Sequence, residues 1–217
     1  MRSMTRILLA GVLFAGSACM AAAHGPSEHS SAAKQPAVSA KAAETGAALR
    51  DLWTGHIFWV RNVAFATLTK NDVAANAAEQ QVVENAKAIA GAIEPFYGVA
   101  AKDALFKLLA GHYGAIKEYL VATAAADSSA QGKAIQTLTK NAEDIAAFLS
   151  KANPHLAKDA VTGLLQAHGG HHVQEIDELK AGKYEAEART WEDMKAHMYV
   201  VSDALAQAIV KQFPSKF

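Results

Sequence analysis

The sequence predicts an all-α protein, an up-and-down bundle of about six helices that contains an internally duplicated helical hairpin. Apolar residues recur at steps of three and four through several long stretches, which is the pattern of amphipathic helices. Proline is rare, with 5 among 217 residues, and runs of β-branched residues are few. The stretch 85–112 also recurs 56 residues later as 141–168, so one pair of helices is expected twice.

The two copies share 11 of 28 positions without a gap. A run of Ala-Lys-Asp-Ala begins at Ala101 and again at Ala157, and a run of Leu-Leu-x-x-His ends at His112 and again at His168. Alanine-rich helices match by chance more easily than other sequences, but these runs also share charged and histidine residues. We therefore interpret the two stretches as copies of one helical hairpin, each ending in a histidine.

The amino terminus has the features of a secretory signal peptide over residues 1–23. Arg2 and Arg6 precede an apolar run, and small residues ending at Ala23 form a cleavage site. We expect a periplasmic or secreted product, with a lipoprotein anchored through Cys19 as the less favoured alternative. Cleavage after Ala23 removes the one cysteine of the chain, which excludes disulfides, thiolate metal sites and haem attached through C-x-x-C-H.

The composition of the rest of the chain limits its domain organisation and its possible partners. Residues 24–40 hold hardly a large apolar side chain, so we expect a disordered segment before a single helical-bundle domain over 41–217. Lys+Arg and Asp+Glu number 21 each, and this balance gives no reason to expect nucleic acid as a partner. No later apolar run is long enough for a second membrane segment, so stable membrane insertion is not expected after signal cleavage.

The first two helices are expected over 41–69 and 72–94. The first carries an aromatic-rich apolar stripe that includes His56. Asn71 is an N-cap signal for the second helix, and Pro95 marks its end.

The third helix is expected over 99–125, with His112 on its apolar face. Asp127 is an N-cap signal for the fourth helix, which should end at Asn153 because Pro154 follows.

The fifth helix is expected over 156–180, with His168 on its apolar stripe. A break at Gly182 separates it from the last helix, over 184–213, which stops before Pro214.

Four histidines lie near the middle of their helices and on the apolar stripe: His56, His112, His168 and His197. Helices that run up and down all cross the middle of a bundle, so inward side chains at that level can meet. A buried imidazole without a partner costs roughly 1–3 kcal/mol, which a shared ligand would offset. We therefore predict that the four converge on a transition metal or a haem iron. The alternative is a structural or protein-interaction module without a cofactor, in which they are core residues.

The residue before each of these histidines is small: Gly55, Gly111, Ala167 and Ala196. Glycine inside a helix costs about 1 kcal/mol against alanine, so the two glycines need a reason. We interpret them as room for a ligand beside the histidines. The alternative is that Ala and Gly are simply abundant in this chain.

A second candidate cluster lies on the fifth helix, where His168, His171, His172 and Glu175 follow one another closely. His168 and His172 are one helical turn apart, and His171 lies four residues before Glu175. This spacing can chelate a metal on one helix face. The alternative is one core histidine and two solvated ones.

The candidate ligands determine which cofactors are expected. Neutral imidazoles favour Zn, Cu or Ni over Ca or Mg. Haem b between two facing histidines is the other candidate, with Met194 or Met198 nearby. A di-iron site is not expected, because the chain has no Glu-x-x-His motif. No nucleophile motif, P-loop or dinucleotide-binding fingerprint occurs, so enzymatic activity is the least favoured class.

Three segments together resemble a family of small exported bacterial all-helical proteins. They are Leu-Arg-x-Leu-Trp-x-x-His-x-x-Trp-x-Arg over 49–61, Asn-Ala-x-x-Ile-Ala beginning at Asn85 and Asn141, and Ile-Val-Lys-Gln-Phe-Pro over 209–214. The similarity covers 49–217. Members often carry automated names such as glycosyltransferase or acetylglutamate kinase, but no nucleotide-binding or acidic metal motif here matches those names. The resemblance implies the helical fold and brings no catalytic residues.

Overall fold

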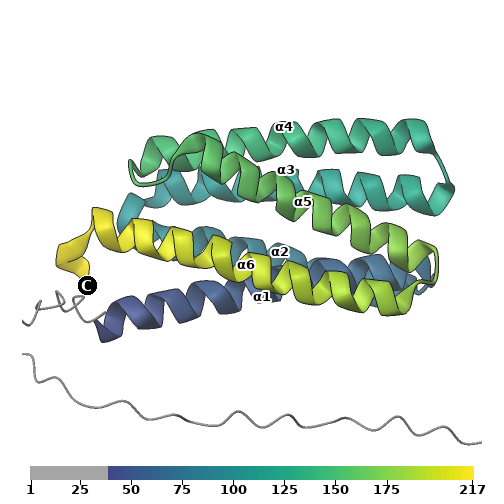
Figure 1. Cartoon of the computed structure of the whole chain (residues 1–217), viewed down its shortest axis with the longest axis horizontal. Coiled ribbons are helices and arrows are strands. Elements are labelled where there is room, and N and C mark those ends of the chain that lie inside the picture. The colour runs from purple at the N-terminus through teal and green to yellow at the C-terminus, as the bar shows by residue number, and fades with distance from the viewer. Residues whose placement is uncertain (1–38) are drawn as a thin grey trace, which may run out of the picture. The chain divides into compact units, whose positions relative to one another are not determined.

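Six α-helices make up the part of the chain that the structure, a computed structural model, describes, which is residues 39–217. They are α1 Ala40–Leu68, α2 Asp72–Tyr97, α3 Val99–Ala125, α4 Ser128–Ala152, α5 Lys158–Lys180 and α6 Tyr184–Gln212, followed by the short 3-10 helix η1 Pro214–Lys216. Residues 39–217 contain no β-strand, and successive helices run up and down side by side (Figure 1). The predicted all-α bundle of six helices is confirmed. The expected signal peptide, Cys19 and the segment up to residue 38 lie outside the described residues.

Three of the helices begin at a capping side chain. Ser39, Asn71 and Asp127 each accept a hydrogen bond, at 3.0–3.1 Å, from the backbone N–H three residues further on. Each bond satisfies one of the donors that the first turn of a helix leaves without a partner. The N-cap signals at Asn71 and Asp127 are therefore confirmed, and they fix the starts of α2 and α4.

One helix end differs from its prediction. We expected α2 to stop before Pro95, but it continues to Tyr97 with the proline inside its last turn. Proline in that turn removes only one backbone donor, which would have bonded to Gly91. The helix ends instead at Gly98, whose φ of 81° is a conformation that favours glycine and whose N–H donates to the Glu94 carbonyl.

The helices also pair as α1–α2, α3–α4 and α5–α6, called here the first, second and third hairpins, which are offset by one helix from the duplicated hairpin predicted from the sequence. A hydrogen bond joins the two helices of each of these pairs at a corresponding place. Asn85 of α2 donates its side-chain amide to the Leu52 carbonyl of α1 at 2.9 Å, and Asn141 donates to the Leu108 carbonyl at 3.0 Å. In the third hairpin, His197 Nε2 donates to the Leu164 carbonyl at 2.9 Å. Donor and acceptor are 33 residues apart in all three cases, and the bonds follow one another at 56 residues. The recurrence agrees with the period of the sequence match, although the duplication itself stays a prediction.

The apolar core lies on both sides of the middle of the bundle. One cluster of buried residues includes Trp53 and Met194, and another includes Val60 and Ile176. His56 lies between Trp53 and Val60 on α1, so a polar layer divides the two clusters. Apolar burial, at roughly 25 cal/mol per Å², supplies the main stabilisation on either side of that layer.

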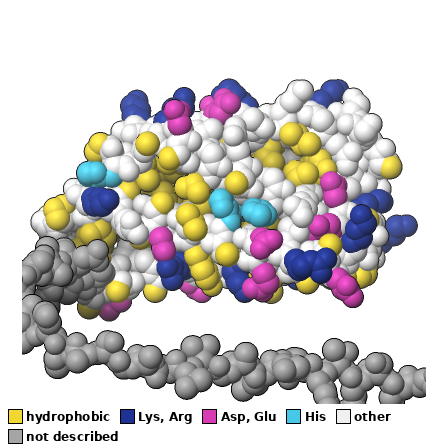
Figure 2. Space-filling view, viewed as in Figure 1, with side chains coloured by type: hydrophobic (Ala, Val, Ile, Leu, Met, Phe, Trp, Pro, Cys, Tyr) yellow, Lys and Arg dark blue, Asp and Glu magenta, His cyan; other side chains and the backbone are white. Residues whose placement is uncertain are grey.

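The outer surface of the bundle mixes charged and apolar side chains (Figure 2). Large exposed apolar residues include Phe58, Phe65 and Val73. Among residues 39–217, none of the helices combines the length and the apolar composition needed to cross a bilayer.

Candidate metal centre

Four imidazoles from three helices form the polar layer. His56 comes from α1, His112 from α3, and both His168 and His172 from α5, and none of the four is more than 4% exposed. The ring centroids of His168 and His172 are 4.6 Å apart, and that of His56 is 5.5 Å from His168 and 5.8 Å from His172. The His112 ring stacks on His168 at 5.4 Å. Residues far apart in the sequence thus form one compact cluster.

Three of these rings can share one ion. One ring nitrogen each from His56, His168 and His172 lies within 4.8 Å of the other two. Nitrogen ligands held 2.0–2.1 Å from a tetrahedral ion are about 3.4 Å from one another, so the rings need to close by at most about 1.4 Å.

Most of the cluster's nitrogens have no hydrogen-bond partner. Within residues 39–217, both nitrogens of His168, both of His172, Nδ1 of His56 and Nε2 of His112 are buried without one. An unsatisfied buried donor or acceptor costs about 1–3 kcal/mol. Buried imidazoles that make no hydrogen bonds to one another are costly as core residues, and a shared ligand, which engages one nitrogen of each ring, would reduce that cost.

His112 is oriented by an asparagine. Its Nδ1 lies 3.1 Å from Oδ1 of Asn141, whose amide nitrogen donates to the Leu108 carbonyl. Because the asparagine presents an acceptor, His112 must donate from Nδ1, which leaves the lone pair on Nε2. Ligating histidines are commonly held through their other nitrogen in this way. The arrangement makes His112 a candidate fourth ligand.

The glycines before two of the histidines have a different role from the one predicted. A Cβ on Gly55 would lie 3.0 Å from the Asn85 amide nitrogen, and a Cβ on Gly111 would lie 3.1 Å from that of Asn141. Both glycines therefore let an asparagine approach the helix backbone and reach the carbonyl three residues earlier. The interpretation that they leave room for a ligand is wrong, because an asparagine occupies that space.

Burial keeps the four imidazoles neutral. It lowers the pKa of His56 to about 3, with a further contribution from His112. It lowers the pKa of His112 to about 4, against the opposing effect of the Asn141 hydrogen bond. The pKa values of His168 and His172 also fall well below the usual range, through burial first and neighbouring histidines second. Neutral imidazoles are the form that binds metal.

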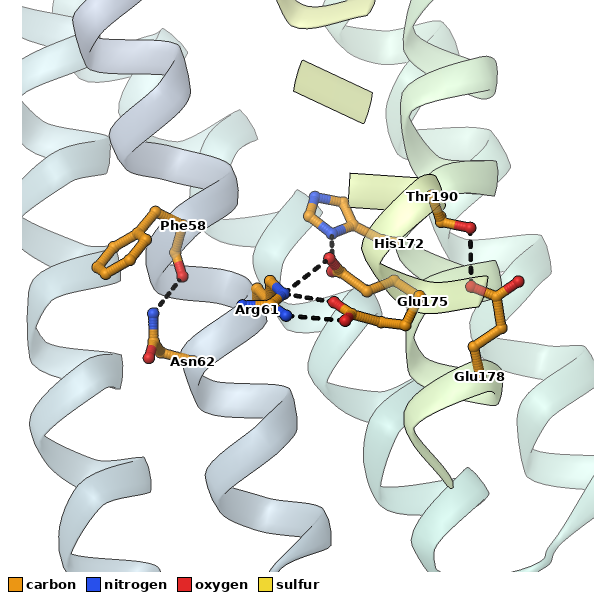
Figure 3. A network of polar contacts seen from close by, with 8 residues as sticks. Phe58, Arg61, Asn62, His172, Glu175, Glu178 and Thr190 are labelled. Atoms are coloured by element: carbon orange, nitrogen blue, oxygen red, sulfur yellow. Dashed lines mark hydrogen bonds and ion pairs between the residues drawn. The ribbon is translucent and has the colours of Figure 1, made fainter. Parts of the chain in front are cut away.

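Glu175 lies at the edge of the cluster, between His172 and Arg61 (Figure 3). Its carboxylate oxygens are 3.8 Å from Nδ1 of His172 and 3.7 Å from Nε of Arg61, and neither oxygen has a hydrogen-bond partner among residues 39–217. Arg61 is engaged by Glu187, which accepts two hydrogen bonds from it. Burial and the Glu187 charge raise the pKa of Glu175 to about 8, so its neutral acid is favoured at pH 7. Arg61 and Glu187 escaped the sequence analysis because 126 residues separate them.

The structure brings three of the four predicted histidines together but leaves His197 outside the cluster. His197 is only half-buried, and its Nε2 bonds to the Leu164 carbonyl. The inward positions of α6 at this level belong to Met194 and Met198, so His197 lies at the edge of the buried stripe. His172, which the sequence placed in the second candidate cluster, joins His56 and His168 instead.

The second candidate cluster is divided between the interior and the surface. On α5, His168, His172 and Glu175 are 1% exposed and face inward. His171 is half-buried and packs against the His197 ring, with centroids 5.5 Å apart. The close group of possible ligands includes His168 and His172 of this helix but neither His171 nor Glu175, so chelation by His171 and Glu175 together stays a prediction.

A largely enclosed apolar cavity of about 60 Å³ adjoins the cluster. His112 and His168 form part of its wall, and the rest is almost entirely apolar, with Trp53, Leu109 and Leu165 among the lining residues. A cavity of this volume has room for molecules of the size of water, about 30 Å³ each in the liquid, and not for a large organic ligand.

Trp53, His56 and Arg61 belong to the motif that resembles exported bacterial helical proteins, and all three lie in or beside the polar layer. That resemblance stays a prediction, and the centre is interpreted from its own geometry. Comparisons of the chain with protein-family models, with curated proteins and with solved structures find no match.

Proposed function

We propose that this protein binds one transition-metal ion inside the bundle, through His56, His168 and His172, with His112 in the fourth position. The observation that carries the proposal is the group of six buried imidazole nitrogens that lack partners within residues 39–217. Three of the rings support it further, because one nitrogen of each lies within 4.8 Å of the other two. An ion would engage one nitrogen of each ring, four of these six, which no side chain of the described residues does.

The donor set suits particular ions. Four neutral imidazoles favour Zn²⁺, Cu²⁺ or Ni²⁺, and the absence of a carboxylate in the close group disfavours Mg²⁺ and Ca²⁺. A centre whose ligands are all protein side chains and which is closed to solvent resembles a structural or carrier site more than a catalytic one. The proposed role is therefore metal binding without a reaction.

Haem is less well supported than a single ion. A porphyrin is many times larger than the cavity of about 60 Å³ beside His112 and His168. Haem would therefore require α-helices to separate around it, whereas an ion requires the three rings to close by at most about 1.4 Å.

The second candidate function is a structural or protein-interaction module without a cofactor. The edge-on packing of the Trp53 ring on His56, at 5.8 Å and 88°, favours this alternative, since it is a common arrangement of aromatic core residues. It leaves the six imidazole nitrogens unsatisfied, and for that reason we place it second.

The leader over residues 1–23 supports a site of action in the periplasm or outside the cell. Mass spectrometry of the exported product tests this part of the proposal. A mature terminus at His24 agrees with a secreted protein, and a lipid on Cys19 would make it membrane-anchored instead.

The metal-binding proposal is tested on full-length protein purified without a tag. Elemental analysis should find a stoichiometric metal, or titration of the metal-free protein with Zn²⁺, Cu²⁺ and Ni²⁺ should raise its thermal midpoint. An ion at 100 times its dissociation constant adds about 2.7 kcal/mol to the free energy of unfolding. A midpoint that none of the three ions moves would favour the structural module.

A double variant separates the two candidate functions. His168→Leu with His172→Leu removes two ligands and four unsatisfied nitrogens, so the metal-free variant should be at least as stable as the original and insensitive to metal. His155→Gln is the matched control, because His155 is exposed and lies in the turn between α4 and α5. A double variant that still gains stability from the ion contradicts the proposed ligands.

A further inference from the structure

We propose that His171 and His197 form a capture site at the protein surface, which takes up the metal ion and passes it to the interior histidines. This inference rests on the proposed function of the interior centre. It assigns to the surface pair a role in the rate of loading rather than in the final affinity.

The pair is positioned as a two-nitrogen ligand. His171 projects from α5 and His197 from α6, both are half-buried, and their ring centroids are 5.5 Å apart with the planes tilted by 49°. Two histidine side chains lie next to each other on the face that α5 and α6 form (Figure 2). Unlike the interior rings, this pair can be reached from solvent.

The hydrogen bond of His197 leaves one nitrogen ready for a metal. Its Nε2 donates to the Leu164 carbonyl, so in the neutral ring the lone pair is on Nδ1. Asp193 lies one helical turn before His197 on α6, and its negative charge acts on His171. A carboxylate near two imidazoles attracts a divalent cation to the pair.

The interior centre needs an entrance, because its three closest ligands are only 1–4% exposed. The surface pair lies directly beside it. His171 precedes His172 in the chain, and His197 is close enough to His168 to interact with it electrostatically. An ion held by the pair therefore has to move only from one face of α5 to the next.

Gly170 makes the intervening turn of α5 easy to open. The preceding Gly169 has a packing reason, since a Cβ there would lie 3.0 Å from a methyl carbon of Leu138. Gly170 has none, because a Cβ would meet no atom within 4 Å. An exposed glycine in a helix interior costs about 1 kcal/mol against alanine. We assign that cost to local opening of α5 between His168 and His171.

The test compares loading rate with final affinity. The variant combines His171→Ala with His197→Asn, since asparagine keeps the carbonyl hydrogen bond in the way that Asn141 does with Leu108. Metal-free full-length protein is mixed rapidly with Co²⁺, whose visible absorption reports tetrahedral coordination, and Zn²⁺ competition then gives the equilibrium affinity. The expected result is loading at least tenfold slower, with the affinity within a factor of two, because an entrance changes uptake and release equally. Gly170→Ala should also slow loading while raising the thermal midpoint, and His155→Ala should change neither.

The outcomes separate this inference from the proposed function. If the unmodified protein shows no tetrahedral Co²⁺ spectrum, the interior centre itself is wrong, and the capture site falls with it. If the unmodified protein loads and the double variant loads at the same rate, the interior centre stands and the capture site is overturned. A loss of affinity equal to the loss of rate would make His171 and His197 ligands of the final site, which also overturns the capture role.

Discussion

Asn141 accepts a hydrogen bond from Nδ1 of His112 at 3.1 Å, and this contact determines which nitrogen of the imidazole carries its lone pair. Asn85 occupies the corresponding place in the first hairpin and bonds to the Leu52 carbonyl, but its own oxygen has no histidine partner in the part of the chain that the structure describes. The two asparagines therefore form a matched pair for mutation. One supports the candidate metal centre, and the other supports only the contact between helices.

Replacing Asn141 by alanine should weaken metal binding about 10–100-fold, which is the usual effect of losing the residue that orients a ligand. Asn85→Ala should leave the affinity unchanged, although both variants lose about 1–2 kcal/mol of stability with the bond to a backbone carbonyl. Zn²⁺ competition titrations and urea denaturation measure the two effects. Equal affinities for the two variants would show that His112 is not a ligand.

The metal-free protein should lose stability in mild acid. In the folded chain burial holds the pKa of His56 near 3 and that of His112 near 4, whereas both titrate near 6.5 when unfolded. The unfolded state thus binds more protons below pH 6.5, so this part of the stability is complete above that pH and is lost as the pH falls toward the folded values. The slope reaches about 1.4 kcal/mol per pH unit for each histidine.

Urea denaturation between pH 7.5 and 4.5 measures this dependence. His56→Leu should make the curve less steep, whereas His155→Gln at the exposed position should leave it unchanged. A free energy of unfolding that stays flat through this range would mean that the cluster binds protons without cost.

Glu175→Gln should stabilise the protein at pH 8 and have little effect at pH 4.5. The folded pKa of this carboxyl is raised to about 8, above its unfolded value, so the stability associated with the acid form is present below about pH 4.5 and declines as the pH rises toward 8. Glutamine mimics the neutral acid at every pH and avoids that decline. Denaturation at the two pH values measures the difference, with exposed Glu143→Gln as the control. A variant less stable than the original at pH 8 would mean that Glu175 is buried as a satisfied carboxylate.

Alanine at two nearby glycines of α3 should have opposite effects. At Gly114 a Cβ meets nothing within 4 Å, so Gly114→Ala should gain up to about 1 kcal/mol of stability. At Gly111 it would lie 3.1 Å from the Asn141 amide, which two hydrogen bonds hold in place, so Gly111→Ala should lose stability. Thermal and urea denaturation decide between these signs. A stabilising Gly111→Ala would show that Asn141 can move away.

Arg61→Met should cost about 2–3 kcal/mol, less than the roughly 3–5 kcal/mol for breaking a fully buried ion pair, because Arg61 is 34% exposed. The loss comes mainly from leaving the Glu187 carboxylate buried without its partner. Adding Glu187→Gln to this variant should recover part of the stability, which urea denaturation can measure. If adding Glu187→Gln lowers the free energy of unfolding further, Glu187 has another partner after Arg61 is removed.

Much of the fold could be predicted from the sequence, because the signals were local. The spacing of apolar residues and the caps at Asn71 and Asp127 place six helices with ends close to those observed. The predicted end of α2 before Pro95 was wrong because a proline in the last turn costs only one hydrogen bond. The helix ends at Gly98 instead.

The candidate site was only partly predictable, because it depends on how the helices rotate against one another. Periodicity placed His56, His112 and His168 on inward faces correctly. It could not decide whether His197 or Met198 faces the interior. The two are neighbours in the chain, 100° apart around the helix axis, and both lie near the edge of the apolar stripe. The ion pair of Arg61 with Glu187 joins α1 to α6, and no local pattern predicts such a pairing.

His56, His112 and His168 each follow, by four residues, the leucine whose carbonyl accepts the bond between the helices of its hairpin. A trimer of identical subunits would bring three identical ligands to its axis in a comparable way. Such an assembly can alter its ligands only three at a time. A single chain is free of that constraint: where the first two hairpins carry Val60 and Ile116, the third carries His172. Asymmetry of this kind lets one position change its chemistry while the other two keep theirs.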